Sequence, residues 1–179
     1  MPPFSEEWEI LLAYARDEAM RTGWLNIAPD HLMLAILRHR DNAACRLLVS
    51  SGIAPDACKD ALDEAVFSPE PVPYAMRDSI FPNARTLAVL NIALLEASQC
   101  PALPPCALHL LAALLRTGNS RACAYLREHR LTLSAIRSLY PKTNGPETPV
   151  PDPKEIAEIL AEQIRKTFPA APAPDSFIS

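Results

Sequence analysis

An internal repeat constrains the fold of this 179-residue chain more than any other feature of its sequence. A shift of 78 residues aligns segment 32–38 with segment 110–116, and the alignment continues on both sides without a gap. The same shift places His31 on His109. Because the matching apolar residues recur at helical spacing, the pattern predicts a duplicated, all-α unit.

Each copy is predicted to contain four short helices, because N-capping residues, first-turn prolines and C-terminal glycines recur along it. In the first copy (about residues 4–66) we expect helices at about 6–22, 29–38, 42–51 and 55–66, with Asp41 capping the third. A linker of about residues 67–79 follows, and its Ser-Pro-Glu-Pro-Val-Pro segment is predicted to be extended. In the second copy (about 80–140) the expected helices run at about 83–98, 105–116, 120–129 and 133–140.

The C-terminal region, residues 141–179, begins with a proline-rich stretch that favours an extended tether. An amphipathic helix is predicted at about 153–167, with Asp152 as its cap, and the last residues after Pro169 are predicted to be disordered. Its apolar stripe contains Ile156, Leu160 and Ile164. Two alternatives remain open for these candidate partner-binding residues: the helix docks in a groove of another protein, or it folds back over its own domain.

The composition excludes several classes of function. Only four glycines occur, and they are widely separated, so no Walker A loop, dinucleotide-binding fingerprint or kinase glycine-rich loop is present. A net charge of −4 without a basic block argues against nucleic acid as a partner. The longest apolar runs are about half the length of a membrane span. Five cysteines without CxxC spacing indicate reduced, mostly buried thiols and a cytoplasmic protein.

The repeated unit resembles the Clp N-terminal repeat domain, which precedes the ATPase modules of Clp/Hsp100 unfoldases. The resemblance covers roughly residues 4 to 140, and its most specific part is the segment Ile27-Ala28-Pro29-Asp30-His31-Leu32. It implies an all-α, pseudo-twofold domain of about eight helices, to which this chain adds a C-terminal helix. It also implies binding of adaptor proteins, substrate segments or peptide-like ligands. Because no Walker A loop is present, we expect a stand-alone domain that does not hydrolyse ATP by that route.

The resemblance also implies candidate ligand-binding residues. In some relatives a hydrophobic groove lies where the first helices of the two repeats meet, with an aromatic residue heading each helix. Phe4 and Phe81 head the repeats here, although each can instead tie the incoming chain onto its own helix. Some relatives bind phosphorylated arginine through the acidic residue before each repeat's histidine. Asp30 keeps that acid and Leu108 does not, so two-site recognition of this kind is not expected.

The histidines and cysteines have a structural and a chemical interpretation. The repeated His31 and His109 are expected to hydrogen-bond a neighbouring backbone while their rings pack. Alternatively Cys100, Cys106, His109 and Cys123 form a Cys₃His zinc site or a thiol-dependent catalytic site, although no pair has CxxC spacing.

We therefore predict a non-catalytic protein- or peptide-binding module of the Clp chaperone–protease type, without cofactor or metal. It would act as an adaptor, a substrate-binding subunit or a regulatory subunit, with a Clp ATPase, an adaptor or a client protein as partner. The alternatives are a small metal- or thiol-dependent enzyme that uses the His109 and cysteine cluster, and a structural subunit of a Clp-type or secretion-associated assembly.

Overall fold

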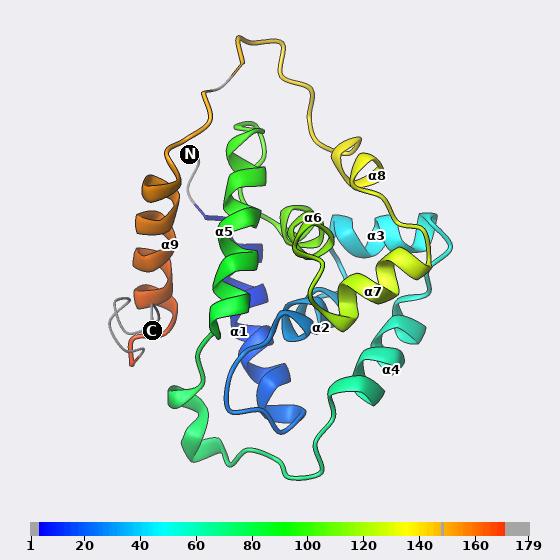
Figure 1. Cartoon of the computed structure of the whole chain (residues 1–179), viewed down its shortest axis with the longest axis vertical. Helices are drawn as coiled ribbons and strands as arrows, with labels where there is room; N and C mark the ends of the chain where they lie inside the picture. Colours follow the sequence, from blue (N-terminus) through cyan, green and yellow to red (C-terminus); the bar gives the residue numbers. More distant parts are fainter. Residues whose placement is uncertain (1–3, 148, 171–179) are drawn as a thin grey trace.

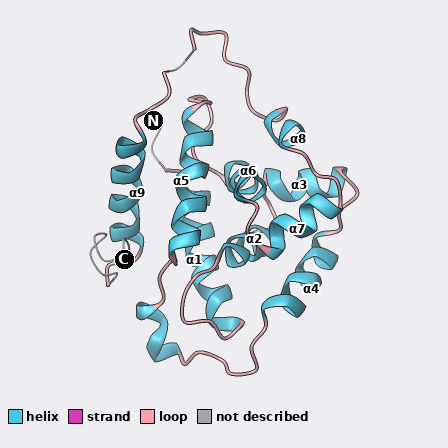
Figure 2. Cartoon of the chain, in the orientation of Figure 1, coloured by secondary structure: helices cyan, strands magenta, loops and turns pink. Residues whose placement is uncertain are grey.

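The computed structural model describes residues 4–147 and 149–170, and within these ranges the chain is helical without a β-strand (Figures 1 and 2). The predicted disorder at the end of the chain concerns residues that lie mostly outside these ranges. The elements are α1 (Glu6–Arg21), α2 (Pro29–Arg38), α3 (Ala43–Ser50), α4 (Pro55–Val66), the 3₁₀ helix η1 (Tyr74–Ser79), α5 (Ala84–Ser98), α6 (Ala107–Thr117), α7 (Arg121–Glu128), α8 (Leu133–Arg137) and α9 (Pro153–Thr167).

The predicted duplication is confirmed by the helix starts. Each of α5, α6, α7 and α8 begins 78 residues after its counterpart in the series α1, α2, α3 and α4. Their caps repeat as well, because Asn42 and Ser120 each accept a hydrogen bond from the backbone N–H three residues later. The all-α class and the repeated four-helix unit are therefore features of the fold as well as of the sequence.

Three predicted boundaries are wrong by a few residues. Helix α3 is capped by Asn42 rather than Asp41, because the Asn42 Oδ1 accepts the Cys45 N–H. The Asn42 amide also donates to the Ile36 carbonyl at 3.0 Å, which fixes its side chain in this position. Helix α6 begins at Ala107 rather than at Pro105, because Cys106 is its extended N-cap. Helix α8 ends at Arg137 and continues only as a tight turn to Tyr140, which precedes a proline.

Helices α2 and α6 form the centre of the fold (Figure 1). Every residue from Pro29 to Leu37 and from Ala107 to Leu115 is buried, so these two helices are covered on all sides. Helix α1 packs along α2, and α5 packs along α6. Apolar residues around the whole circumference are typical of a helix in a core.

The linker between the repeats passes over the end of α1. Ser68 donates its backbone N–H to the Thr22 carbonyl at 2.8 Å. At Gly23, where φ is +82°, a Cβ atom would lie only 2.5 Å from the Glu70 carbonyl oxygen. Glycine is therefore required twice here, by the backbone conformation and by the close approach of the linker. The linker is not helical as far as Pro73, but it bends at Pro69 and Glu70 instead of being extended throughout as predicted, and the 3₁₀ helix η1 that follows was not predicted.

Helix α9 folds back over its own domain and packs against α5 and α1 (Figure 1). Ile156, Leu160 and Ile164 are at most 5% exposed, and Phe168 lies with its ring 4.4 Å from the Arg16 guanidinium. Within the described ranges no hydrogen bond or ion pair joins α9 to the other helices. The helix is held by apolar packing and one cation–π contact. No helix in the described ranges is long and apolar enough to cross a bilayer.

Candidate functional site: a pocket at the junction of the repeats

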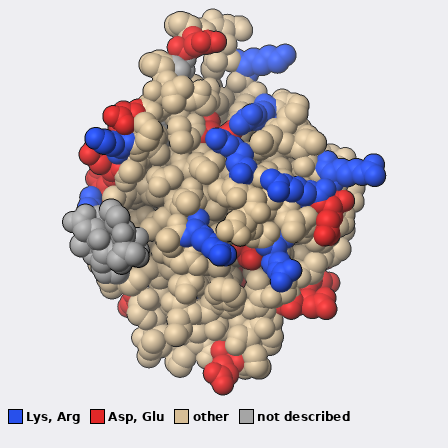
Figure 3. All heavy atoms as spheres, in the orientation of Figure 1, with Lys and Arg blue, Asp and Glu red and all other residues tan. Residues whose placement is uncertain are grey.

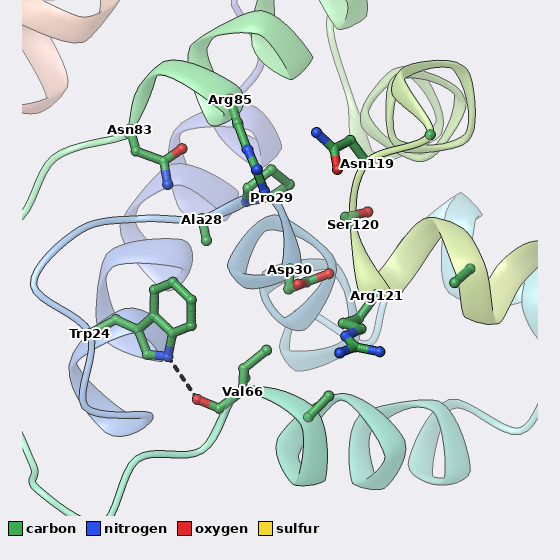
Figure 4. Close-up of a pocket in the computed structure, with 13 residues that line it drawn as sticks. Trp24, Ala28, Pro29, Asp30, Val66, Asn83, Arg85, Asn119, Ser120 and Arg121 are labelled. Carbon is green, nitrogen blue, oxygen red and sulfur yellow. Dashed lines mark hydrogen bonds between the residues drawn. The ribbon is translucent and has the colours of Figure 1, made fainter.

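A pocket of about 500 Å³ lies where the two repeats meet (Figure 4). We call it the junction pocket. Its walls come from the N-terminal ends of α2, α5 and α7, the turn before α7 and the end of α4, so both repeats contribute. The lining residues are Trp24, Ala28, Pro29, Asp30, Ala65, Val66, Asn83, Arg85, Gly118, Asn119, Ser120, Arg121 and Ala124.

A short backbone pairing fixes the upper wall of the junction pocket. Ile27 donates its N–H to the Phe81 carbonyl at 2.8 Å, and its own carbonyl accepts from the Asn83 N–H at 3.0 Å. The Thr86 hydroxyl donates to the same Ile27 carbonyl at 2.6 Å. These bonds hold the start of α5 beside the start of α2. Residues 59 positions apart in the chain are thus brought to one rim of the pocket.

Asp30 lies inside the junction pocket and caps α7 from across the repeat boundary. Its Oδ1 accepts the backbone N–H of Ala122 at 2.8 Å, and the residue is 9% exposed. Burial raises the pKa of Asp30, and the N–H groups of Ala122 and Arg121 and the charge of Arg121 oppose that shift. A carboxylate at this place accepts a backbone N–H of the first turn of α7, and its negative charge interacts favourably with the positive end of the helix dipole. Asp30 was a predicted site residue, but its bond to α7 was not predicted.

Two arginines and two amides make the rest of the pocket polar. Arg85 on α5 and Arg121 on α7 are exposed, and in the described part of the chain neither makes an ion pair. Asn119 precedes α7, and Asn83 caps α5. Figure 4 shows these side chains arranged around the opening that Asp30 faces. The lining thus combines two cations, two amides and one carboxylate whose oxygen is already hydrogen-bonded.

The opposite wall of the junction pocket is apolar and held in place. The Trp24 indole N–H donates to the Val66 carbonyl at 2.7 Å, which ties the loop after α1 to the end of α4 (Figure 4). The same indole contacts the ring of His31 edge-on, with 5.3 Å between ring centroids. A rigid aromatic wall opposite charged side chains is suited to binding a peptide segment.

The two predicted aromatic residues do not line this pocket. Phe4 packs against the ring of Trp8 at a centroid distance of 5.7 Å, and Phe81 is half-buried beside the start of α5. The face between α1 and α5 is where α9 packs. Binding of a ligand by Phe4 and Phe81 in a groove remains a prediction. Partner binding by Ile156, Leu160 and Ile164 would require α9 to leave the position that it has here.

The two histidines make equivalent contacts through Nδ1, but in the described part of the chain only His31 has a hydrogen-bond partner at Nε2. In each, Nδ1 accepts the N–H of the helix N-cap residue, with 2.9 Å from Ala28 to His31 and 3.2 Å from Cys106 to His109. The proton is therefore on Nε2, which in His31 lies 2.9 Å from the Thr22 hydroxyl. Burial lowers the pKa of both histidines to about 4. The predicted backbone hydrogen bond by a packed histidine is confirmed.

The cysteine cluster does not have the properties of a thiolate site. Cys106 Sγ lies 3.4 Å from His109 Nδ1, but burial raises the pKa of the Cys106 thiol to about 11. A protonated thiol beside a neutral imidazole is the opposite of an activated cysteine–histidine pair. Among the described residues no group of three His, Cys, Asp or Glu side chains is placed to hold a metal ion. Cys123 donates to the Leu115 carbonyl instead.

A pair of buried carboxylates was not predicted from the sequence. Glu18 and Glu96 are 78 positions apart, are each 3% exposed, and each bind arginines from their own repeat. Glu96 accepts from Arg116 at 2.8 Å and from Arg137 at 2.6 Å, and these bonds hold the pKa of Glu96 below its ordinary value against the effect of burial. The recurrence of a Glu at positions 18 and 96 and of an Arg at positions 38 and 116, each 78 residues apart, was the signal that could have identified this pair.

Comparison with known proteins agrees with this architecture. Residues 3–102 match the Clp repeat (R) N-terminal domain. The chain is also 24% identical over 134 residues to a protein of Bacillus subtilis (strain 168) described as "Negative regulator of genetic competence ClpC/MecB". That similarity covers 75% of this chain and only 16% of the relative. The similarity therefore concerns a small part of the larger protein.

Proposed function

Because this chain belongs to the family of Clp repeat N-terminal domains, we propose that it binds segments of other proteins as a non-catalytic adaptor or regulatory subunit of a Clp-type chaperone or protease system in the cytoplasm. The partner would be a Clp ATPase, an adaptor or a client protein. A regulatory role would parallel that of the Bacillus relative, which is described as a negative regulator of genetic competence. The neutral histidines and the protonated Cys106 thiol described above support binding rather than catalysis.

The observation that carries this proposal is the junction pocket. It is built by both repeats, it is lined by exposed polar side chains, and it contains two arginines without ion-pair partners in the described chain. Exposed cations and amides beside a fixed aromatic wall offer a peptide both backbone and side-chain contacts. The covered face between α1 and α5 offers no such access while α9 is docked.

Site-specific photo-crosslinking tests the proposal. A photoreactive phenylalanine analogue would replace Asn119 at the pocket, and in a matched control it would replace Glu158, an exposed residue on α9. We expect cells expressing the Asn119 variant to yield a discrete adduct, reproduced with the purified partner, that the Glu158 variant does not give. Equal adducts from both positions, or none from Asn119, would contradict the assignment of the pocket.

A further inference from the structure

Two exposed apolar residues lie beside the aromatic wall of the junction pocket. Leu25 is 61% exposed and follows Trp24, and Phe67 is 59% exposed and follows Val66. The hydrogen bond from the Trp24 indole to the Val66 carbonyl, 2.7 Å long, holds these two backbone segments together. Single exposed apolar side chains are ordinary. Leu25 and Phe67 do not line the pocket itself, but each directly follows a residue that does, so both are exposed next to its apolar wall.

The charge of the pocket favours an anionic partner. Most arginines of the described chain bind carboxylates, among them Arg21, Arg38 and Arg116, whereas Arg85 and Arg121 do not. Although the chain carries a net charge of −4, the face turned toward the viewer in Figure 3 has Lys and Arg around its centre and most Asp and Glu near its edge. The one carboxylate in the pocket, Asp30, is already bonded to α7.

We infer that the junction pocket and the adjoining residues Leu25 and Phe67 bind an extended acidic segment of a partner protein, with apolar side chains next to its carboxylates. Arg85 and Arg121 would bind the carboxylates, and Trp24, Leu25 and Phe67 would contact the apolar side chains. This inference rests on the proposed function and adds the chemistry of the bound segment.

The size and the character of the surface favour a protein segment. A volume of about 500 Å³ accommodates a few residues of peptide. The amide of Asn119 offers a donor and an acceptor, which match the N–H and C=O groups of an extended backbone, whereas the amide of Asn83 is already bonded to Thr86 and Asn26. A nucleic acid would instead require a continuous basic track, whereas here two arginines stand beside apolar side chains.

Fluorescence anisotropy with three labelled twelve-residue peptides tests the inference. The first alternates Glu with Phe and Leu, the second has Gln in place of every Glu, and the third has Ser in place of every Phe and Leu. We expect the first to bind at micromolar concentrations, more weakly as salt is raised, and each of the other two to bind at least about tenfold more weakly. Equal binding of the Glu and Gln peptides would overturn the inference.

Protein variants locate the contact. Arg85→Ala and Arg121→Ala should each weaken binding of the Glu peptide by about two- to fivefold, since each removes one rim charge. Arg165→Ala, an exposed arginine of α9, is the matched control and should have no effect. An equal loss in the Arg165 variant, or no loss in the other two, would refute the assignment. All three side chains are exposed, so the variants should fold, and circular dichroism checks this.

The inference and the proposed function can fail separately. If the Asn119 crosslinker captures a partner but the Glu peptide does not bind at millimolar concentration, the inferred chemistry is wrong and the binding function stands. If neither is observed, both are wrong.

Discussion

The buried histidine pair predicts a specific dependence of stability on pH. Replacing both residues, as His31→Gln and His109→Gln, removes two groups that can titrate while retaining an oxygen that can accept the N-cap N–H. The two remaining histidines, His39 and His129, are present in both proteins, so their contribution to the pH dependence of stability is the same in both.

The direction follows from the two pKa values. Each buried histidine has a pKa of about 4 in the folded chain, against an ordinary value of 6.5. Well above pH 6.5 both states are neutral and the histidines do not affect stability. As the pH falls from 6.5 to 4, the unfolded chain binds protons that the folded chain does not, so stability decreases through this window. Between pH 7 and 5.5 the loss is about 1.2 kcal/mol for each histidine, or about 2.5 kcal/mol for the pair.

Urea denaturation at pH 7.0, 6.5, 6.0 and 5.5, followed by circular dichroism, measures this difference. The free energy of unfolding of the native sequence should fall by about 2.5 kcal/mol more than that of the double variant over this range. The variant can be less stable at pH 7, because it loses the contact with Thr22, but its dependence on pH should be flatter. Parallel curves for the two proteins would show that the histidines titrate in the folded state as they do in the unfolded chain, and the buried geometry described above would be wrong.

Three further substitutions test the packing. Leu160 is a buried residue of α9, 3% exposed, and Leu160→Ala removes its apolar contacts with the rest of the domain. The substitution should lower the free energy of unfolding by about 2–4 kcal/mol or speed hydrogen exchange throughout α9. Gly23→Ala should cost at least about 1 kcal/mol more than Gly52→Ala in thermal unfolding, because both have positive φ but only Gly23 faces a backbone carbonyl, and equal costs would refute the close approach. Glu96→Gln should lower the free energy of unfolding by about 1–3 kcal/mol in urea, an effect that moderate salt should not abolish because the carboxylate is buried.

The sequence predicted the helices well because their signals are local. Caps such as Ser5 and Thr132, first-turn prolines and the repeat itself identified nearly every helix and the duplication. The errors lie at boundaries where neighbouring residues compete, as Asp41 and Asn42 do for the start of α3. The packing partner of α9 could not be predicted, because an amphipathic stripe is the same whether it faces its own domain or another protein.

The candidate site was only partly predictable. Asp30 was identified through its place before His31, but Arg85 and Arg121 carry no local signal of a site. They meet at the pocket because the start of α5 is bonded to Ile27 and the start of α7 to Asp30. Such contacts between repeats depend on the fold as a whole and cannot be obtained from the spacing of residues in one segment.

Mapping the bound peptide by NMR tests the central claim most directly. Amide shifts of the ¹⁵N-labelled protein would be followed while the Glu peptide is added. The largest changes are predicted at the junction pocket, in residues 27–30, 83–86 and 118–124, with α9 unchanged. Changes concentrated in α1, α5 and α9 instead, or spread evenly over the surface, would contradict the assignment of the junction pocket as the binding site.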